Sequence, residues 1–107
     1  MLTFIETTHF TKLIQEYLTD DEYAVLQRAL VANPDAGDRI RGAGGVRKLR
    51  WSVGGHGKRG GIRVIYYLRT SLGEVWMLTA YKKNVVDSIP ASVLRKIRNE
   101  IDDKGKT

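Results

Sequence analysis

Cysteine is missing from this sequence of 107 residues, and its absence excludes a disulfide scaffold and any metal site built on thiolates. No apolar run approaches the ~20 residues that a membrane-spanning helix needs, so we expect a cytoplasmic protein with no membrane contact. Histidine, aspartate and glutamate form no cluster with the spacing of metal ligands. We therefore expect neither a metal nor any other cofactor.

What the chain does contain fits one small domain. At ~100–200 residues per domain, its length allows a single domain over residues 1–107. Hydrophobic residues make up 42% of the sequence and charged residues 28%. That composition supplies apolar material for a core and argues against a disordered chain.

Acidic residues are missing from the middle of the chain, so the positive excess behind the net charge of +6 is concentrated there. Residues 39–73 hold nine Lys and Arg but no Asp or Glu, whereas residues 1–38 hold seven acids and two bases. Eight of the eleven glycines fall within residues 42–61, inside the same basic block. Glycines beside bases let a backbone turn and approach phosphates closely, so the block favours a polyanionic partner.

Hydrophobic spacing in the first third predicts a short strand over residues 2–6 and then two helices. Apolar residues recur at helical spacing from Phe10 to Tyr17. Thr19 and Glu22 match the capping box that begins a second helix, and an Asn-Pro pair ends that helix. Because the link between the helices is very short, we expect an antiparallel helical hairpin.

From residue 46 the hydrophobic period changes to two, which is typical of strands. Strands at about residues 46–53, 62–68 and 75–81 are expected to form an antiparallel meander. Ser88 is the expected N-cap of a last helix, and residues 101–107 form a polar tail that we expect to fray. The order predicts an α+β fold with the helices on one face of a small sheet and the other face open to a ligand.

Five segments carry a resemblance to a known family: residues 17–23 (YLTDDEY), 33–38 (NPDAGD), 42–50 (GAGGVRKLR), 57–67 (GKRGGIRVIYY) and 78–84 (LTAYKKN). In order and spacing they resemble the HigB branch of the RelE/ParE toxin superfamily, the RelE-like mRNA interferases. The resemblance implies a RelE-like fold, with an N-terminal strand and helical hairpin, a three-stranded meander and a C-terminal helix. It also implies the toxin of a type II toxin–antitoxin system, which cleaves mRNA in the ribosomal A site and inhibits translation.

The same resemblance implies the partners. They are the ribosome with its rRNA, the mRNA, and a cognate antitoxin that carries a helix-turn-helix DNA-binding domain. Operator DNA is then reached only through the antitoxin.

Cleavage of RNA by internal attack needs a group that takes the 2′-hydroxyl proton, positive charge near the phosphate and a proton for the leaving 5′-oxygen. Arg63 lies on the strand face opposite the apolar one, and the resemblance implies that it stabilises the scissile phosphate. It also implies that Lys83 is the second basic residue of the site. Lys58 is a further candidate because neighbouring cations ease the loss of a lysine proton, and which lysine acts as base stays open. His56 titrates in a useful range, although a solvated loop histidine is the simpler interpretation.

Other residues are predicted to bind RNA: Arg47, Lys48 and Arg50 through phosphates, and Tyr67 and Tyr81 by stacking on nucleobases. Arg59 and Lys82 are further basic residues that we expect to bind RNA. A solvated strand face is the alternative for Arg63 and for Arg47, Lys48 and Arg50, and packing is the alternative for the two tyrosines. The family pattern places a tyrosine shortly after the second basic residue, and this sequence has none there. Tyr66 is expected in the core.

Two other functions are open on the sequence alone. A ParE-like inhibitor of DNA gyrase shares the implied fold and needs no ribonuclease site, but the density of bases in residues 39–73 argues against it. A non-enzymatic basic module that binds nucleic acid by charge alone is the other alternative. The placement of Arg63 on its strand argues against that module.

Overall fold

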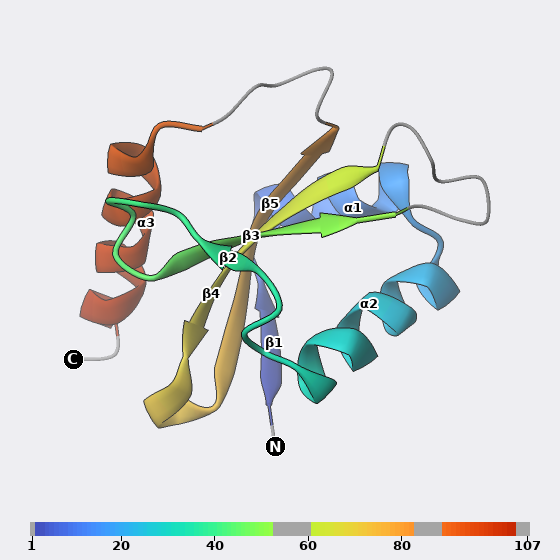
Figure 1. Cartoon of the computed structure of the whole chain (residues 1–107), viewed down its shortest axis with the longest axis horizontal. Helices are drawn as coiled ribbons and strands as arrows, with labels where there is room; N and C mark the ends of the chain where they lie inside the picture. The colour runs from blue at the N-terminus through green and yellow to red at the C-terminus, as the bar shows by residue number, and fades with distance from the viewer. Residues whose placement is uncertain (1, 53–60, 83–88, 105–107) are drawn as a thin grey trace.

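Three helices and a five-stranded mixed sheet form the α+β domain that the computed structural model describes over residues 2–52, 61–82 and 89–104 (Figure 1). The helices are α1 (Thr8–Tyr17), α2 (Asp20–Ala32) and α3 (Ala91–Lys104). The strands are β1 (Thr3–Glu6), β2 (Asp38–Arg39), β3 (Val46–Trp51), β4 (Ile62–Arg69) and β5 (Glu74–Lys82). They lie in the order β1-β5-β4-β3-β2, with β1 parallel to β5 and the other neighbours antiparallel. None of the helices in these described residues is long and apolar enough to cross a membrane.

The first two helices begin where the sequence predicts because side chains cap them. The Thr7 hydroxyl accepts a hydrogen bond from the Phe10 amide at 3.0 Å, and α1 begins at the next residue, Thr8. At α2 the Thr19 hydroxyl accepts from the Glu22 amide at 3.1 Å, and the Glu22 carboxylate accepts from the Thr19 amide at 2.8 Å. These two bonds confirm the predicted capping box.

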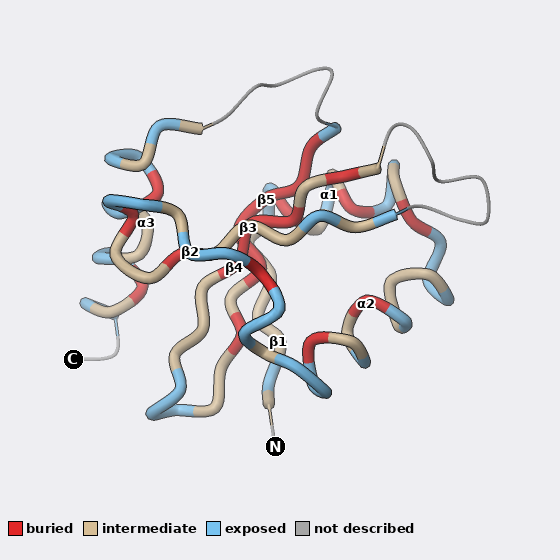
Figure 2. Tube along the Cα trace, in the orientation of Figure 1, coloured by how far each residue is buried: buried red, intermediate tan, exposed pale blue. Residues whose placement is uncertain are grey.

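The helices cover both faces of the sheet, with α1 and α2 on one face and α3 on the other (Figure 1). Val64 and Tyr66 of β4 pack with α1 and α2, whereas Ile65 between them packs with α3. The prediction that all helices lie on one face is therefore wrong. The reason is that β4 and β5 carry apolar residues on both faces, as strands covered on both sides do. Much of both strands is buried (Figure 2). We call the two sides of the sheet the α1/α2 face and the α3 face.

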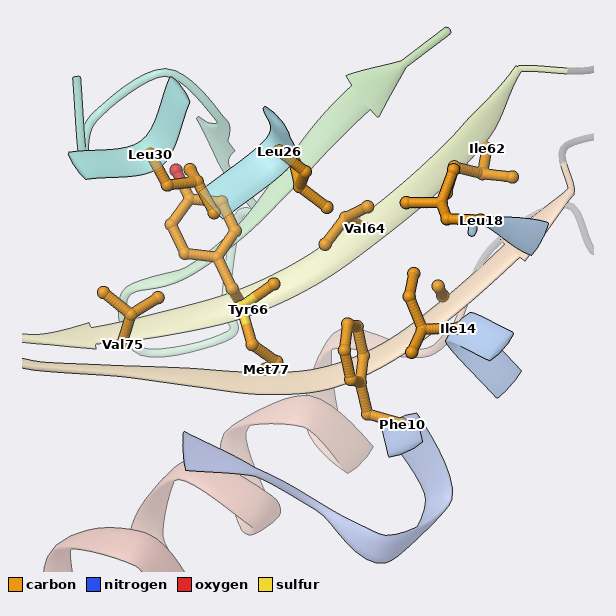
Figure 3. Packing of buried hydrophobic residues seen from close by; sticks show 11 residues of the cluster. Phe10, Ile14, Leu18, Leu26, Leu30, Ile62, Val64, Tyr66, Val75 and Met77 are labelled. Atoms are coloured by element: carbon orange, nitrogen blue, oxygen red, sulfur yellow. The ribbon is translucent and has the colours of Figure 1, made fainter. Parts of the chain in front are cut away.

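Tyr66 of β4 joins the core under α2 to the segment that follows this helix (Figure 3). The side chain is fully buried, and its hydroxyl donates to the carbonyl of Pro34 at 2.7 Å and accepts from the amide of Gly37 at 2.9 Å. A Cβ added at Gly37 would lie 2.8 Å from the Tyr66 ring, so only glycine fits there. The predicted core position of Tyr66 is confirmed, and this tyrosine fixes the chain between α2 and β2.

Replacing Tyr66 with phenylalanine is expected to lower the free energy of unfolding by about 1–3 kcal/mol, because the buried Gly37 amide loses its acceptor. Urea unfolding followed by circular dichroism measures this loss. Tyr17→Phe is the matched control, since the Tyr17 hydroxyl makes no hydrogen bond within the described residues. Equal unfolding midpoints for the two variants would contradict the prediction.

Helix α3 is held to the sheet near its C-terminal end by the carboxylate of Asp102. This carboxylate accepts from the Tyr67 hydroxyl at 3.1 Å. It also forms ion pairs with Arg69 at 3.5 Å and with Arg98 at 3.2 Å. One acidic side chain of α3 thus joins two arginines and a tyrosine, of which Arg69 and Tyr67 belong to β4.

The predicted frayed tail is wrong for residues 101–104, where α3 continues. Ile101 is buried against the α3 face, and the next residue is the Asp102 anchor, so this turn of helix packs. Residues 105–107 and the predicted cap Ser88 lie outside the described residues.

Glycines before β3 shape the contact between α3 and the sheet. Gly42, Gly44 and Gly45 all have positive φ, at 81°, 72° and 100°. A Cβ at Gly44 would lie 2.8 Å from Nε of Arg98, and this Nε donates to the Gly44 carbonyl at 2.9 Å. Gly44 therefore leaves the space in which Arg98 of α3 bonds the chain before β3.

Candidate nucleic-acid interface

Two arginines and a tyrosine form one cross-strand row on the α3 face. In the register of the sheet, Arg63 of β4 lies opposite Arg50 of β3 on one side and opposite Tyr81 of β5 on the other. Directly opposed residues of antiparallel strands have Cβ atoms about 4.5–5.5 Å apart. We call Arg50, Arg63 and Tyr81 the arginine row. Lys48 belongs to the next row on the same face, opposite Ile65.

Three positive charges on this face are not neutralised by the described part of the protein. Arg50, Arg63 and Lys48 form no hydrogen bond or ion pair with a described residue. Asp38 lies opposite Lys48 in the register, yet no ion pair joins the two. Like charges that face each other across two strands destabilise a sheet. Two opposed arginines at a surface therefore make a place where a bound anion relieves repulsion.

Three further arginines are used by the fold instead. Arg69 and Arg98 share the carboxylate of Asp102. Arg47 donates to the carbonyl of Gly37 at 2.7 Å, and it also pairs with Asp35 at 3.3 Å. The nine bases of residues 39–73 are thus not one uniform patch.

Arg47 is predicted to bind RNA beside Lys48 and Arg50, and the structure separates it from them. It lies opposite Tyr66 in the register and therefore on the α1/α2 face. The reason is that side chains alternate between the two faces of a strand. Lys48 and Arg50 therefore lie on one face of β3, and Arg47 lies on the other. With 14% of its side chain exposed and its guanidinium bonded, Arg47 does not belong to the interface.

A bulge in β5 brings Tyr81 to the face of Arg63. The ladder between β4 and β5 skips Leu78, so β5 has one residue more than β4 along this stretch. Every residue after the bulge changes faces, and without it Tyr81 would lie on the α1/α2 face with Met77. The Thr7 hydroxyl donates to the Leu78 carbonyl at 2.8 Å and thereby holds the bulge in place.

The hydroxyl of Tyr81 reaches the surface, whereas its ring is buried. The residue is 6% exposed and packs in the core under α3. Its hydroxyl bonds to no described residue, and no fully buried side-chain oxygen of the described residues lacks a partner, so this hydroxyl reaches the surface. Burial raises the pKa of Tyr81, and the positive charge of Arg63 partly opposes that rise. The buried ring contradicts the predicted stacking role, because a base needs an open ring face.

Tyr67 and Lys82 lie apart from the arginine row. Tyr67 is on the α3 face but four residues along β4 from Arg63, which is about 13 Å at 3.3 Å per residue. Its hydroxyl is bound to Asp102. Lys82 is on the α1/α2 face, where its Nζ lies 6.0 Å from the ring centre of Tyr17. Contacts of these two residues with RNA stay predictions, at separate places on the molecule.

Four predicted site residues lie outside the described residues: His56, Lys58, Arg59 and Lys83. Their roles stay predictions. In the chain, Lys83 is two residues beyond Tyr81, and Arg59 is four residues before Arg63.

An apolar groove of about 410 Å³ lies between α3, β5 and the start of α1. Its lining residues are Thr7, His9, Leu78, Thr79, Ile89, Val93, Leu94 and Ile97. Among the described residues this lining contains no lysine or arginine, so we place the anion site on the arginine row and not in the groove. Within residues 2–52, 61–82 and 89–104, no group of three or more acidic residues and histidines could hold a metal ion.

A search against models of known protein families finds no match to the chain. The chemistry of the arginine row is therefore the main guide to function. Two guanidinium groups can hold an anion by charge and by paired hydrogen bonds. The Tyr81 hydroxyl adds a neutral donor beside them.

Proposed function

We propose that this protein is a RelE-like toxin of the HigB type, a ribosome-dependent endoribonuclease that cleaves mRNA in the A site. In this proposal a cognate antitoxin from the same operon neutralises it. The observation that carries the proposal is the pair of opposed arginines, Arg50 and Arg63, with no acidic partner among the described residues. The segments that resemble HigB toxins supply the ribosome and the mRNA as partners.

The proposed chemistry is internal attack on a phosphodiester. The 2′-oxygen attacks the phosphorus, and negative charge grows on the two oxygens that do not bridge nucleotides. The Arg63 guanidinium stays charged at any physiological pH and can bind these oxygens through two parallel hydrogen bonds. Arg50 adds a second positive charge to the same phosphate or to the next one along the strand. Lys48 is suited to a backbone phosphate that positions the RNA.

The fold supports the proposal at the level of architecture. The chain has the strand, two helices, antiparallel meander and last helix that the resemblance implies, together with the short edge strand β2. The acidic first third keeps RNA away from α2, whose first turn carries Asp20, Asp21 and Glu22. RNA is thereby directed to the α3 face.

A reconstituted translation reaction tests this function. We expect an mRNA held on stalled ribosomes to be cut within the A-site codon, with primer extension locating the cut. The same mRNA without ribosomes should stay intact. Two results would overturn the proposal: intact mRNA together with inhibited supercoiling by gyrase, which identifies a gyrase inhibitor, or RNA binding with no cleavage, which identifies a non-enzymatic module.

A further inference from the structure

We propose that Tyr81 is the general acid of this cleavage, and that its hydroxyl protonates the 5′-oxygen leaving the phosphate held by Arg63. The inference rests on the proposed function and assigns a proton donor that the sequence does not identify. It replaces the predicted stacking role of Tyr81 with a chemical one.

The geometry singles out Tyr81 among the five tyrosines of the chain. Three other tyrosine hydroxyls already form hydrogen bonds within the protein: that of Tyr23 with Glu6, that of Tyr66 with the backbone after α2, and that of Tyr67 with Asp102. Tyr17 lies on the α1/α2 face, under Lys82. Tyr81 alone combines a surface hydroxyl with a place opposite Arg63.

The surroundings of Tyr81 hold its hydroxyl in one position. The ring packs against α3 residues in the core, so the side chain has little freedom to move. The bulge at Leu78 sets the face on which the ring lies, and the Thr7 hydroxyl bonds the carbonyl of that bulge. A proton donor is effective when it is held at hydrogen-bond distance from the atom that receives the proton.

The protonation state suits an acid and not a base. Burial raises the pKa of Tyr81, so the phenol keeps its proton at neutral pH. Arg63 acts in the opposite direction, because its charge stabilises the phenolate that forms when the proton leaves. The arginines themselves do not release protons in proteins, which excludes them as acids.

The proton balance closes with water as the other participant. The 2′-oxygen bonds to phosphorus while its proton passes to a water molecule. The bond between phosphorus and the 5′-oxygen breaks, its electron pair goes to the 5′-oxygen, and the Tyr81 proton completes the new 5′-hydroxyl. The phenolate then recovers a proton from water, and the second product is a 2′,3′-cyclic phosphate.

Single-turnover cleavage of ribosome-bound mRNA by Tyr81→Phe is the first measurement. We expect a rate about 100-fold lower than that of the native protein, since general acid catalysis contributes about 10²–10⁴. Ribosome binding and the melting temperature should stay unchanged, because the ring and its packing are kept. Tyr17→Phe is the matched control and should cleave at the native rate.

A substrate with sulfur in place of the leaving 5′-oxygen separates proton donation from a structural role. A thiolate leaves without protonation, so Tyr81→Phe should cleave this substrate as fast as the native protein does. Should Tyr81→Phe fail to fold, Tyr81→3-fluorotyrosine keeps the ring, and its more acidic phenol should move the high-pH limb of the rate profile to lower pH.

The outcomes distinguish this inference from the function beneath it. If the native protein leaves ribosome-bound mRNA intact, the proposed function fails. If the native protein cleaves and Tyr81→Phe cleaves the oxygen substrate equally fast, Tyr81 is not the acid and the function stands. A variant that is slow on both substrates likewise shows that Tyr81 is not the acid.

Discussion

Arg63→Ala is expected to lower the rate of ribosome-dependent mRNA cleavage about 1,000-fold, the upper end of what the loss of one transition-state donor costs. The reason is that alanine removes both the charge and the planar fork that holds the phosphate oxygens. Arg63→Lys should recover part of the rate, since lysine restores the charge without the fork. Single-turnover cleavage on stalled ribosomes measures both variants.

The stability of Arg63→Ala gives a second expectation. Arg63 faces Arg50 across the ladder and has no acidic partner in the described part of the chain. Removing it relieves repulsion, so the melting temperature should stay the same or rise while activity falls. This opposite movement of stability and activity is typical of a residue kept for function.

Arg39→Ala is the matched control for Arg63→Ala. Arg39 comes from the same basic block and is exposed, but it lies opposite Arg47 and therefore on the α1/α2 face. We expect this variant to cleave at the native rate. Equal toxicity of Arg63→Ala and the native protein at equal expression would show that Arg63 does not stabilise the transition state.

Local signals in the sequence predict the elements well. The caps at Thr7 and Thr19 and the period of two in β3 and β4 depend on residues a few positions apart. The sides covered by helices depend on distant contacts, and there the prediction is wrong. Successive apolar residues in β4, with Val64 and Ile65 side by side in the chain, are the signal that could have indicated cover on both faces.

In the candidate site, too, local sequence predicts the position of some residues and not of others. Alternation along β3 places Lys48 and Arg50 on one face, and alternation along β4 places Arg63 on the face opposite to that of Val64; the register between the two strands then brings the three to the same side. Tyr81 could not be placed by alternation, because the bulge at Leu78 reverses the pattern after it. That bulge is bonded by Thr7, 71 positions away in the chain, so no local pattern indicates it.

The role of Asp102 also depends on distant contacts that local sequence does not indicate. Its replacement has the largest effect on stability that we expect. The polar sequence after Ile101 is typical of a frayed tail. Instead, Asp102 contacts Tyr67 and Arg69, which are distant in the chain, and Arg98 on the preceding turn of α3. A charged residue near a terminus is therefore uninformative until its partners are known.

Asp102→Ala is expected to lower the free energy of unfolding by about 3 kcal/mol, above the ~1 kcal/mol of an exposed pair and at the low end for a buried one. Arg69, whose side chain is 16% exposed, loses one of its two carboxylate partners, and the Tyr67 hydroxyl loses its acceptor. Urea unfolding measures the loss. The control is Asp103→Ala, because Asp103 is exposed and has no partner within the described residues.

The pH dependence adds an independent test of the same anchor. Burial, and then the hydrogen bond to Asp102, raise the pKa of Tyr67 above its ordinary value of 10.0. The folded protein therefore holds this proton more tightly than the unfolded chain. The stability that Tyr67 contributes is complete below about pH 10 and is lost as the pH rises further. Asp102→Ala removes the contribution of the carboxylate, so the fall between neutral and strongly alkaline pH should be smaller than in the native protein. An unfolding midpoint equal to that of Asp103→Ala would show that α3 is held by its apolar face alone.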